Sequence, residues 1–164
     1  MSQYWAGYRN AGMVLEEKEF NAFLEKYKEV HSDDQDVQSQ IEALDNGNTP
    51  IDEIKFFTSD AVYDDTDATF RIEKIGEDTC EGPYFVPFRM NGQTNVACQG
   101  ERKFGTLYFI PAAYDLCAPT VFEKQPYSSY DSFLREMDGK ADCYLPNNFD
   151  WDAHIGVLSY ACFA

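Results

Sequence analysis

Two aspartates and a histidine alternate near the end of the chain, as Asp150, Asp152 and His154. In an extended segment alternate side chains project to one face, where two carboxylates and an imidazole would converge. Such a mixed oxygen and nitrogen set binds divalent transition metals. The same residues also suit a short helix that Asp150 caps and Asp152 follows in its first turn. We favour this structural role, so neither a metal nor another cofactor is predicted.

A second group of carboxylates lies between Asp60 and Asp67, where Asp64, Asp65 and Asp67 form an Asp-Asp-x-Asp sequence. Hard cations such as Ca²⁺ and Mg²⁺ take oxygen ligands of this kind. The EF-hand pattern fails, because neither its glycine nor its last glutamate follows. A solvated acidic loop is the simpler interpretation.

Nucleophilic catalysis has few candidates among the five cysteines and two histidines. Cys162 could combine with His154 and Asp152, or another cysteine with His31, but the surrounding sequences are neither papain-like nor of the nucleophile-elbow type. No nucleotide-binding or zinc-protease motif is present. We expect a protein that is not an enzyme, with reduced and mostly buried thiols. A metal-dependent enzyme built on Asp150, Asp152 and His154 is an alternative.

The strongest feature of the chain is an acidic block at residues 29–67. The whole chain has a formal net charge of −16, and this block holds twelve carboxylates against one cation, Lys55, a local net charge of −11. Such a field repels nucleic acid and anionic membranes and attracts basic protein surfaces. Direct nucleic-acid binding is not expected, because phosphate contacts need clustered lysine and arginine and the thirteen present here are scattered.

Composition predicts a single compact domain over residues 1–164. Hydrophobic residues make up 44% and aromatic residues 16% of the chain, which is ample material for a core and unlike a disordered acidic tail. Neither a signal-peptide pattern nor an apolar stretch of membrane-spanning length is found. We therefore expect a cytoplasmic protein that does not bind membranes.

The predicted fold class is α+β, with N-terminal helices followed by an antiparallel sheet of four to five strands. An amphipathic helix is predicted from Glu16 to Val30, and a later helix from Ser128 or Ser129 to Gly139. Five short runs with a β-type pattern are predicted to form strands, and the last of them is a C-terminal strand. These runs are 54–58, 69–75, 84–90, 106–110 and 155–163. Pro87 places its strand at an edge or a bulge.

A second N-terminal helix is predicted to begin at Ser32, where Gln35 completes a capping box, and to end at Asn46-Gly47. Asp33 and Asp34 would lie in its first turn, which the helix dipole favours. Its remaining carboxylates would face solvent or a partner, and they are Asp36, Glu42 and Asp45.

With this acidic block, its aromatic richness and no catalytic motif, the chain resembles in character the small acidic anti-defence proteins of phages and mobile elements, the anti-CRISPR and anti-restriction inhibitors. The resemblance implies a nucleic-acid mimic whose acidic face, at residues 29–67, docks on the basic nucleic-acid-binding groove of a defence nuclease. An immunity protein that neutralises a basic nuclease toxin is the alternative.

The predicted partner-binding residues are the acids of this block together with one tyrosine: Asp33, Asp34, Asp36, Glu42, Asp45, Asp60, Tyr63, Asp64, Asp65 and Asp67. Charge pairs contribute rate and specificity more than affinity, so aromatic anchors are expected beside them. The candidate anchors are Tyr63, Phe56, Phe57, Tyr4, Trp5 and Tyr8.

Overall fold

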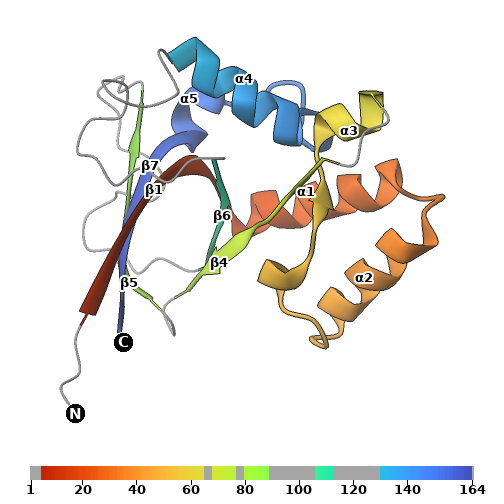
Figure 1. Ribbon diagram of the computed structural model, residues 1–164, viewed down its shortest axis with the longest axis horizontal. Helices are drawn as coiled ribbons and strands as arrows, with labels where there is room; N and C mark the ends of the chain where they lie inside the picture. Colours follow the sequence, from red (N-terminus) through yellow and green to blue (C-terminus); the bar gives the residue numbers. More distant parts are fainter. Residues whose placement is uncertain (1–4, 65–67, 77–79, 89–105, 113–129, 164) are drawn as a thin grey trace.

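A computed structural model of the chain describes residues 5–64, 68–76, 80–88, 106–112 and 130–163. It confirms the α+β class: a five-stranded antiparallel sheet lies on one side and helices lie beside and above it (Figure 1). In chain order the elements are β1 (Trp5–Glu16), α1 (Glu17–Val30), α2 (Gln35–Asp45), η1 (Ile51–Glu53), β2 (Phe56–Phe57), α3 (Ser59–Asp64), β3 (Thr69–Phe70), β4 (Glu73–Ile75), β5 (Cys80–Pro87), β6 (Leu107–Pro111), α4 (Tyr130–Ala141), η2 (Asp142–Tyr144), α5 (Trp151–His154) and β7 (Ile155–Phe163).

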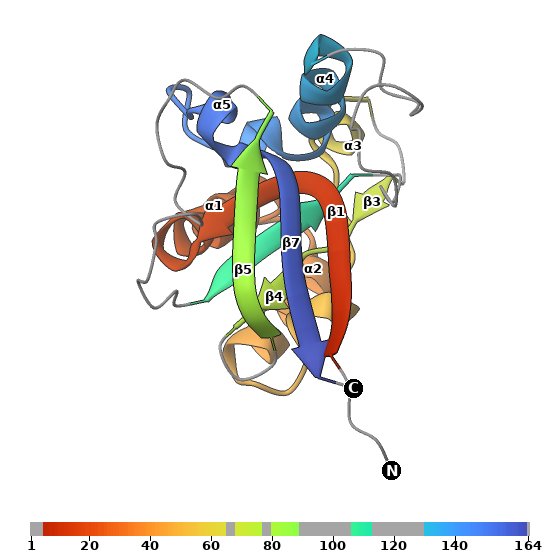
Figure 2. The same cartoon turned by 90° about the vertical axis from the view of Figure 1, so that its left-hand side faces the viewer.

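The large sheet has the strand order β4-β6-β1-β7-β5. Figure 2 shows β5, β7 and β1 side by side, with β1 and β7 antiparallel over the register Trp5↔Phe163 to Met13↔Ile155. The sequence pattern predicted this C-terminal strand, and the structure shows that it is an inner strand of the sheet. Pro87 closes the edge strand β5, which confirms the edge position expected of it.

The central strand β1 was not predicted, because its residues show no alternation of apolar and polar side chains. Every residue from Ala11 to Leu15 is buried, as in a strand covered on both faces. Gly12 pairs with Gly156 of β7, and a Cβ at either position would collide with a backbone carbonyl of the next strand, Ile110 or Val86. Glycine therefore permits the close approach of strands at the centre of the sheet.

Side chains of the sheet alternate between two apolar clusters. One face joins the large core with α1, α2 and α4, and its members from the strands include Met13, Leu15, Tyr108 and Ile110. The other face forms a smaller cluster of Val14, Ile75, Phe85, Leu107, Phe109 and Leu158. The predicted amphipathic helix α1 buries one largely aromatic face, and its Phe20 ring stacks on Tyr108 with centroids 3.7 Å apart.

The second helix begins later than its sequence predicted. Asp34 is the N-cap of α2, and its side chain accepts hydrogen bonds from the backbone N–H groups of Asp36 at 3.0 Å and Val37 at 3.2 Å. Ser32 and Asp33 precede the helix, so the capping box at Ser32 was wrong. Serine and aspartate are both strong N-caps. Asp34 rather than Ser32 caps the helix because of its position relative to the apolar side chains of α2.

Three further boundaries differ from the prediction. The acidic segment after Thr58 is the helix α3 rather than a loop as far as Asp64. The run 69–75 divides into β3, which pairs with β2 in a separate two-stranded sheet, and β4, which joins the large sheet. Helix α4 continues past Gly139 to Ala141. Among the described residues, no helix combines the length and the apolar character that crossing a membrane requires.

Candidate functional site

A buried polar network holds the loop before α2 against β2 and η2. The Tyr144 hydroxyl donates to the backbone oxygen of Phe57 at 2.7 Å, and the Phe57 N–H donates to the Tyr27 hydroxyl at 3.0 Å. His31 Nε2 lies 2.9 Å from the Tyr144 hydroxyl, whose only proton is already committed, so Nε2 acts as the donor. Burial, partly offset by Asp34, lowers the pKa of His31. The network thus brings the start of α2 towards the chain segments that carry α3 and η2.

Helix α3 is fixed against α4 and η2 through its first residues. The Cys143 N–H donates to Ser59 Oγ at 2.7 Å, and Ser59 is 1% exposed. Asp60 lies beside α4, where a Cβ on Gly139 would be 2.5 Å from its Oδ2 atom. Glycine at this position therefore allows the Asp60 carboxylate to approach the α4 backbone.

These contacts place Asp60 of α3 near two carboxylates from the last third of the chain, Asp138 and Asp142. Partial burial, the charge of Asp142, a side-chain hydrogen bond with Asp142 and the charge of Asp60 all raise the pKa of Asp138. Like charges this close disfavour ionisation of one another. Sequence reasoning missed both residues, because the i,i+4 spacing of Asp138 and Asp142 shows a shared helical face but does not show that α3 lies beside it.

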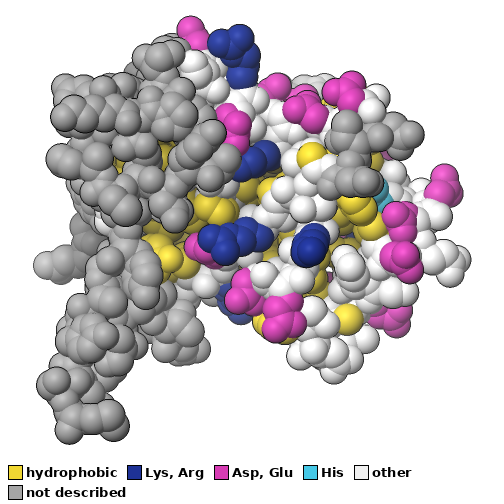
Figure 3. All heavy atoms as spheres, in the orientation of Figure 1, with side chains coloured by type: hydrophobic (Ala, Val, Ile, Leu, Met, Phe, Trp, Pro, Cys, Tyr) yellow, Lys and Arg dark blue, Asp and Glu magenta, His cyan; other side chains and the backbone are white. Residues whose placement is uncertain are grey.

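We use the name acidic face for the carboxylates just before α2 and on its outer side, on α3, near the end of α4 and at the start of η2, together with the tyrosine of α3. Its members are Asp33, Asp34, Asp36, Glu42, Asp60, Tyr63, Asp64, Asp138 and Asp142. All of these are exposed except Asp34, which is half-buried as the N-cap of α2. Figure 3 shows acidic side chains along the side of the molecule occupied by α2 and α3, with lysine and arginine nearer its middle. Asp65 and Asp67 lie outside the described residues.

Some carboxylates of the block are already paired. Lys28 contacts both Asp45 and Glu25 at 3.2 Å, and Lys26 contacts Glu29 at 3.6 Å. Asp45 was predicted to bind a partner, but its charge is shared with Lys28 on α1. Within the described residues, no ion pair involves an acid of the acidic face.

Tyr63 is the most exposed large apolar side chain described, at 68%, and its neighbour Val62 is 38% exposed. Partial loss of water and the nearby acidic groups of Cys143, Asp142 and Asp138 raise the pKa of Tyr63. Phe56 is fully buried and cannot be an anchor, which corrects that prediction; Phe57 is half-buried. The side chains of the remaining candidate anchors lie outside the described residues, and they are Tyr4, Trp5 and Tyr8.

The Asp150 to His154 segment is helical, so its three ligand candidates do not share the face of a strand. Asp150 caps α5, accepting from the Ala153 N–H at 3.3 Å. Both ring nitrogens of His154 are engaged: Nδ1 donates to the Asp150 backbone oxygen at 2.6 Å, and Nε2 lies 2.7 Å from Glu19 Oε2. Asp152 lies in the first turn. The helix-capping interpretation is confirmed, and among the described residues no three His, Cys, Asp or Glu side chains are grouped to hold a metal.

Burial disfavours the charged forms of His154 and Glu19. The contact between the two side chains outweighs this effect of burial. For His154, burial would lower the pKa, but the hydrogen bond and charge of Glu19 raise it above 6.5. For Glu19, burial would raise the pKa, but the hydrogen bonds from His154 and from the Glu16 N–H lower it below 4.5. The contact therefore favours the charged form of His154 and ties α5 to α1.

The described thiol is not activated for catalysis. Burial raises the pKa of Cys143, against the opposing hydrogen bonds to Ser59 and Tyr144. Cys143 is a free cysteine and half-buried. A raised thiol pKa leaves little thiolate at neutral pH, and the thiolate is the nucleophile.

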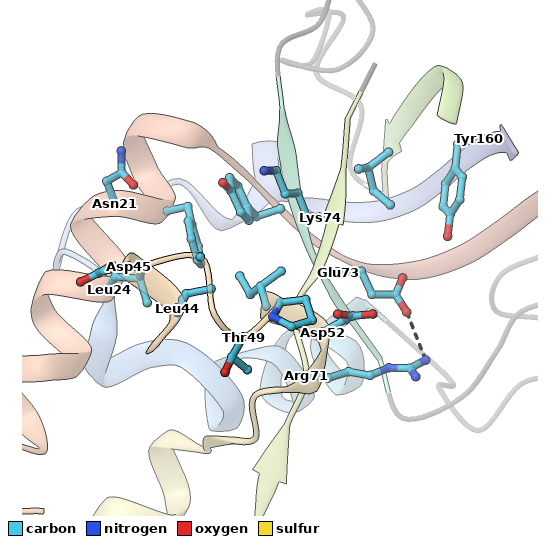
Figure 4. Close-up of a pocket in the computed structure, with 16 residues that line it drawn as sticks. Asn21, Leu24, Leu44, Asp45, Thr49, Asp52, Arg71, Glu73, Lys74 and Tyr160 are labelled. Atoms are coloured by element: carbon cyan, nitrogen blue, oxygen red, sulfur yellow. Dashed lines mark ion pairs between the residues drawn. The ribbon is translucent and has the colours of Figure 1, made fainter. Parts of the chain in front are cut away.

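A cavity of about 880 Å³ opens between α1, η1 and the β4 edge of the sheet (Figure 4). Its charged lining has three carboxylates and two cations: Asp45, Asp52, Glu73, Arg71 and Lys74. Arg71 is held by Glu73 at 3.2 Å. Charges of both signs therefore lie around this cavity, with one more carboxylate than cation among its described lining residues.

The geometry of the acidic face thus consists of exposed carboxylates on several elements around one exposed tyrosine. The Cys143 thiol and both histidine rings are engaged in structural contacts. No protein-family model, curated protein or solved structure matches this chain.

Proposed function

We propose that this protein is a non-enzymatic inhibitor whose acidic face docks on the basic nucleic-acid-binding groove of a nuclease. The observation that supports this most is the position of Tyr63, which is 68% exposed and has Asp60 and Asp64 on its own helix and Asp138 and Asp142 beside it. Exposed tyrosines surrounded by polar groups are frequent anchors of protein interfaces.

The charge pattern supports a protein partner with a basic groove. Duplex DNA presents roughly one negative charge per 1.7 Å of its axis, and a groove that binds it must carry a corresponding density of lysine and arginine. Carboxylates on α2, α3 and the end of α4 offer the same sign of charge on a folded surface. A partner of this kind belongs in the cytoplasm, where a defence nuclease meets foreign nucleic acid.

The proposal is tested by pulling down partners of the tagged protein from cells that carry CRISPR and restriction systems. The captured nuclease is then assayed for cleavage with and without the purified protein. We expect stoichiometric inhibition of cleavage. Capture of a nuclease toxin instead would identify an immunity protein, which would use the same face on one cognate toxin.

A charge-matched pair of triple variants tests the face itself. Asp60→Asn, Asp64→Asn and Asp142→Asn together should weaken inhibition about tenfold or more, since each exposed charge pair contributes up to about 1 kcal/mol. The control removes three charges elsewhere, as Glu17→Gln, Asp131→Asn and Asp150→Asn, where asparagine preserves the α5 cap. Equal inhibition by both triple variants would show that the acids of this face only keep the protein soluble.

Tyr63 has its own matched pair of variants. Tyr63→Ala should weaken target binding by about thirtyfold, as expected for an interface anchor worth about 2 kcal/mol. Tyr63→Phe keeps the ring and should bind within a few-fold of the original protein. Both should unfold within about 0.5 kcal/mol of it, because the side chain is exposed. Unchanged binding by Tyr63→Ala would remove Tyr63 from the interface.

A further inference from the structure

A second hollow, of about 610 Å³, lies between α1 and the segment 144–149. It shares no residue with the acidic face. Its floor and walls are aromatic and aliphatic, formed by Phe23, Tyr144, Leu145, Pro146 and Phe149. The volume lies in the range of about 300 to 1,000 Å³ that is typical of small-molecule sites, which combine apolar walls with a few polar groups.

The spacing of residues on α1 explains why the hollow exists. Lys18, Ala22 and Lys26 lie at i, i+4 and i+8, so they form one stripe along the helix. The small Ala22 side chain leaves space in the middle of the stripe, opposite Leu145 and Phe149. The exposed lysines stand on either side of that space.

These lysines give the groove the opposite charge to the rest of the protein. Lys18 makes no ion pair within the described residues, and Lys26 has only an exposed contact of 3.6 Å with Glu29, of a kind worth little. Glu19 also lines the groove, but its oxygens are turned to the protein: Oε1 accepts from the Glu16 N–H at 2.9 Å and Oε2 contacts His154 at 2.7 Å. The groove therefore offers two cations and a compensated carboxylate.

We propose that this groove binds a small amphipathic anion, with its apolar chain or ring against Leu145, Pro146 and Phe149 and its carboxylate between Lys18 and Lys26. The other cavity and the acidic face described above lack this combination. The cavity of 880 Å³ has more carboxylates than cations in its lining, and the acidic face repels anions. The proposal is independent of nuclease inhibition, so either can fail without the other.

Three ten-carbon probes of different charge test it: decanoate, decanol and decyltrimethylammonium, each below the concentration at which it forms micelles. Calorimetric titration of the purified protein should show saturable one-to-one binding of decanoate, weaker binding of decanol and the weakest binding of the cation. The proposal is overturned by equal affinity for decanoate and decanol, by preference for the cation, or by no saturable binding of decanoate.

Variants locate the site. Lys18→Gln and Lys26→Gln should each weaken decanoate binding up to about fivefold, as expected for one exposed charge pair, and leave decanol unchanged. Lys55→Gln, a matched change outside the groove, should leave both unchanged. Ala22→Trp should abolish binding by filling the hollow, while Gln40→Trp, on an exposed position of α2, should not. An equal loss of decanoate binding in Ala22→Trp and Gln40→Trp would refute the assignment. So would a decanoate affinity that is unchanged in both lysine variants.

Discussion

His154 illustrates at the residue scale how one contact decides between two chemical roles. By type and spacing it was a metal-ligand candidate with Asp150 and Asp152. In the structure its ring nitrogens are committed to the Asp150 backbone and to Glu19, a residue 135 positions away in sequence. Because Glu19 lies on α1, no local pattern near His154 identifies it as the partner.

The His154–Glu19 pair predicts a stability that depends on pH. His154 has a pKa raised above 6.5, so its contribution is complete below pH 6.5 and is lost as the pH rises through the raised value. Glu19 has a pKa lowered below 4.5, so its contribution is complete above pH 4.5 and is lost as the pH falls through the lowered value. The pair therefore stabilises the fold most between pH 4.5 and 6.5.

Replacing Glu19 by glutamine should destabilise the protein by about 1 to 3 kcal/mol near the middle of this window, since it removes the partner of a buried charged group. The loss should shrink as the pH rises through the raised pKa of His154. Denaturant unfolding at a series of pH values from the middle of this window upwards measures it, with Glu17→Gln on the exposed side of the same turn as the control. A loss that stays the same across the series would contradict the charged pair.

At the scale of elements, the acidic block is structured more than a solvated loop would be. It forms α2 and α3, and the Tyr144 and Ser59 hydrogen bonds fix the segments that lead into them. Carboxylates on anchored helices keep a defined arrangement, which a partner can recognise with less loss of conformational entropy than a flexible loop would impose. The same hydrogen bonds place Asp138 and Asp142 beside α3. The acidic face therefore includes two carboxylates from outside residues 29–67.

Helix α2 provides a direct test of its observed start. Asp34→Ala should destabilise the protein by about 1 kcal/mol, because the backbone N–H groups of Asp36 and Val37 lose their acceptor. Ser32→Ala should change stability within about 0.5 kcal/mol, as surface substitutions usually do. Thermal and denaturant unfolding distinguish the two; a larger loss at Ser32 would place the cap where the sequence pattern first located it.

For the whole molecule, the net charge of −16 and the acidic face set the range of partners. Exposed charges interact over about 10 Å at 0.1 M salt, so an acidic face of this kind accelerates encounter with a basic partner and repels anionic ones. Five of the ten predicted partner-binding positions lie on α2 or just before it, three lie on α3, and two lie outside the described residues.

Target binding should therefore weaken as salt concentration rises, mainly through a slower association rate, because screening removes long-range attraction. Surface plasmon resonance at low and high salt measures this with the captured nuclease. The matching expectation is that free duplex DNA gives no gel shift at physiological salt. Salt-independent binding of the nuclease, or a shift with DNA alone, would contradict the electrostatic basis of the proposal.

The sequence by itself determined the features that depend on neighbouring residues. It predicted the α+β class, the amphipathic α1, the edge position of β5 and the C-terminal strand β7, since periodicity and proline act locally. The tertiary structure decided what depends on distant contacts: β1 as the central strand, Glu19 as the partner of His154, and the meeting of α3 with Asp138 and Asp142. A strand buried on both faces shows no alternation, and the free energy of a pair such as Glu19 and His154 comes from a packing that only the folded chain creates.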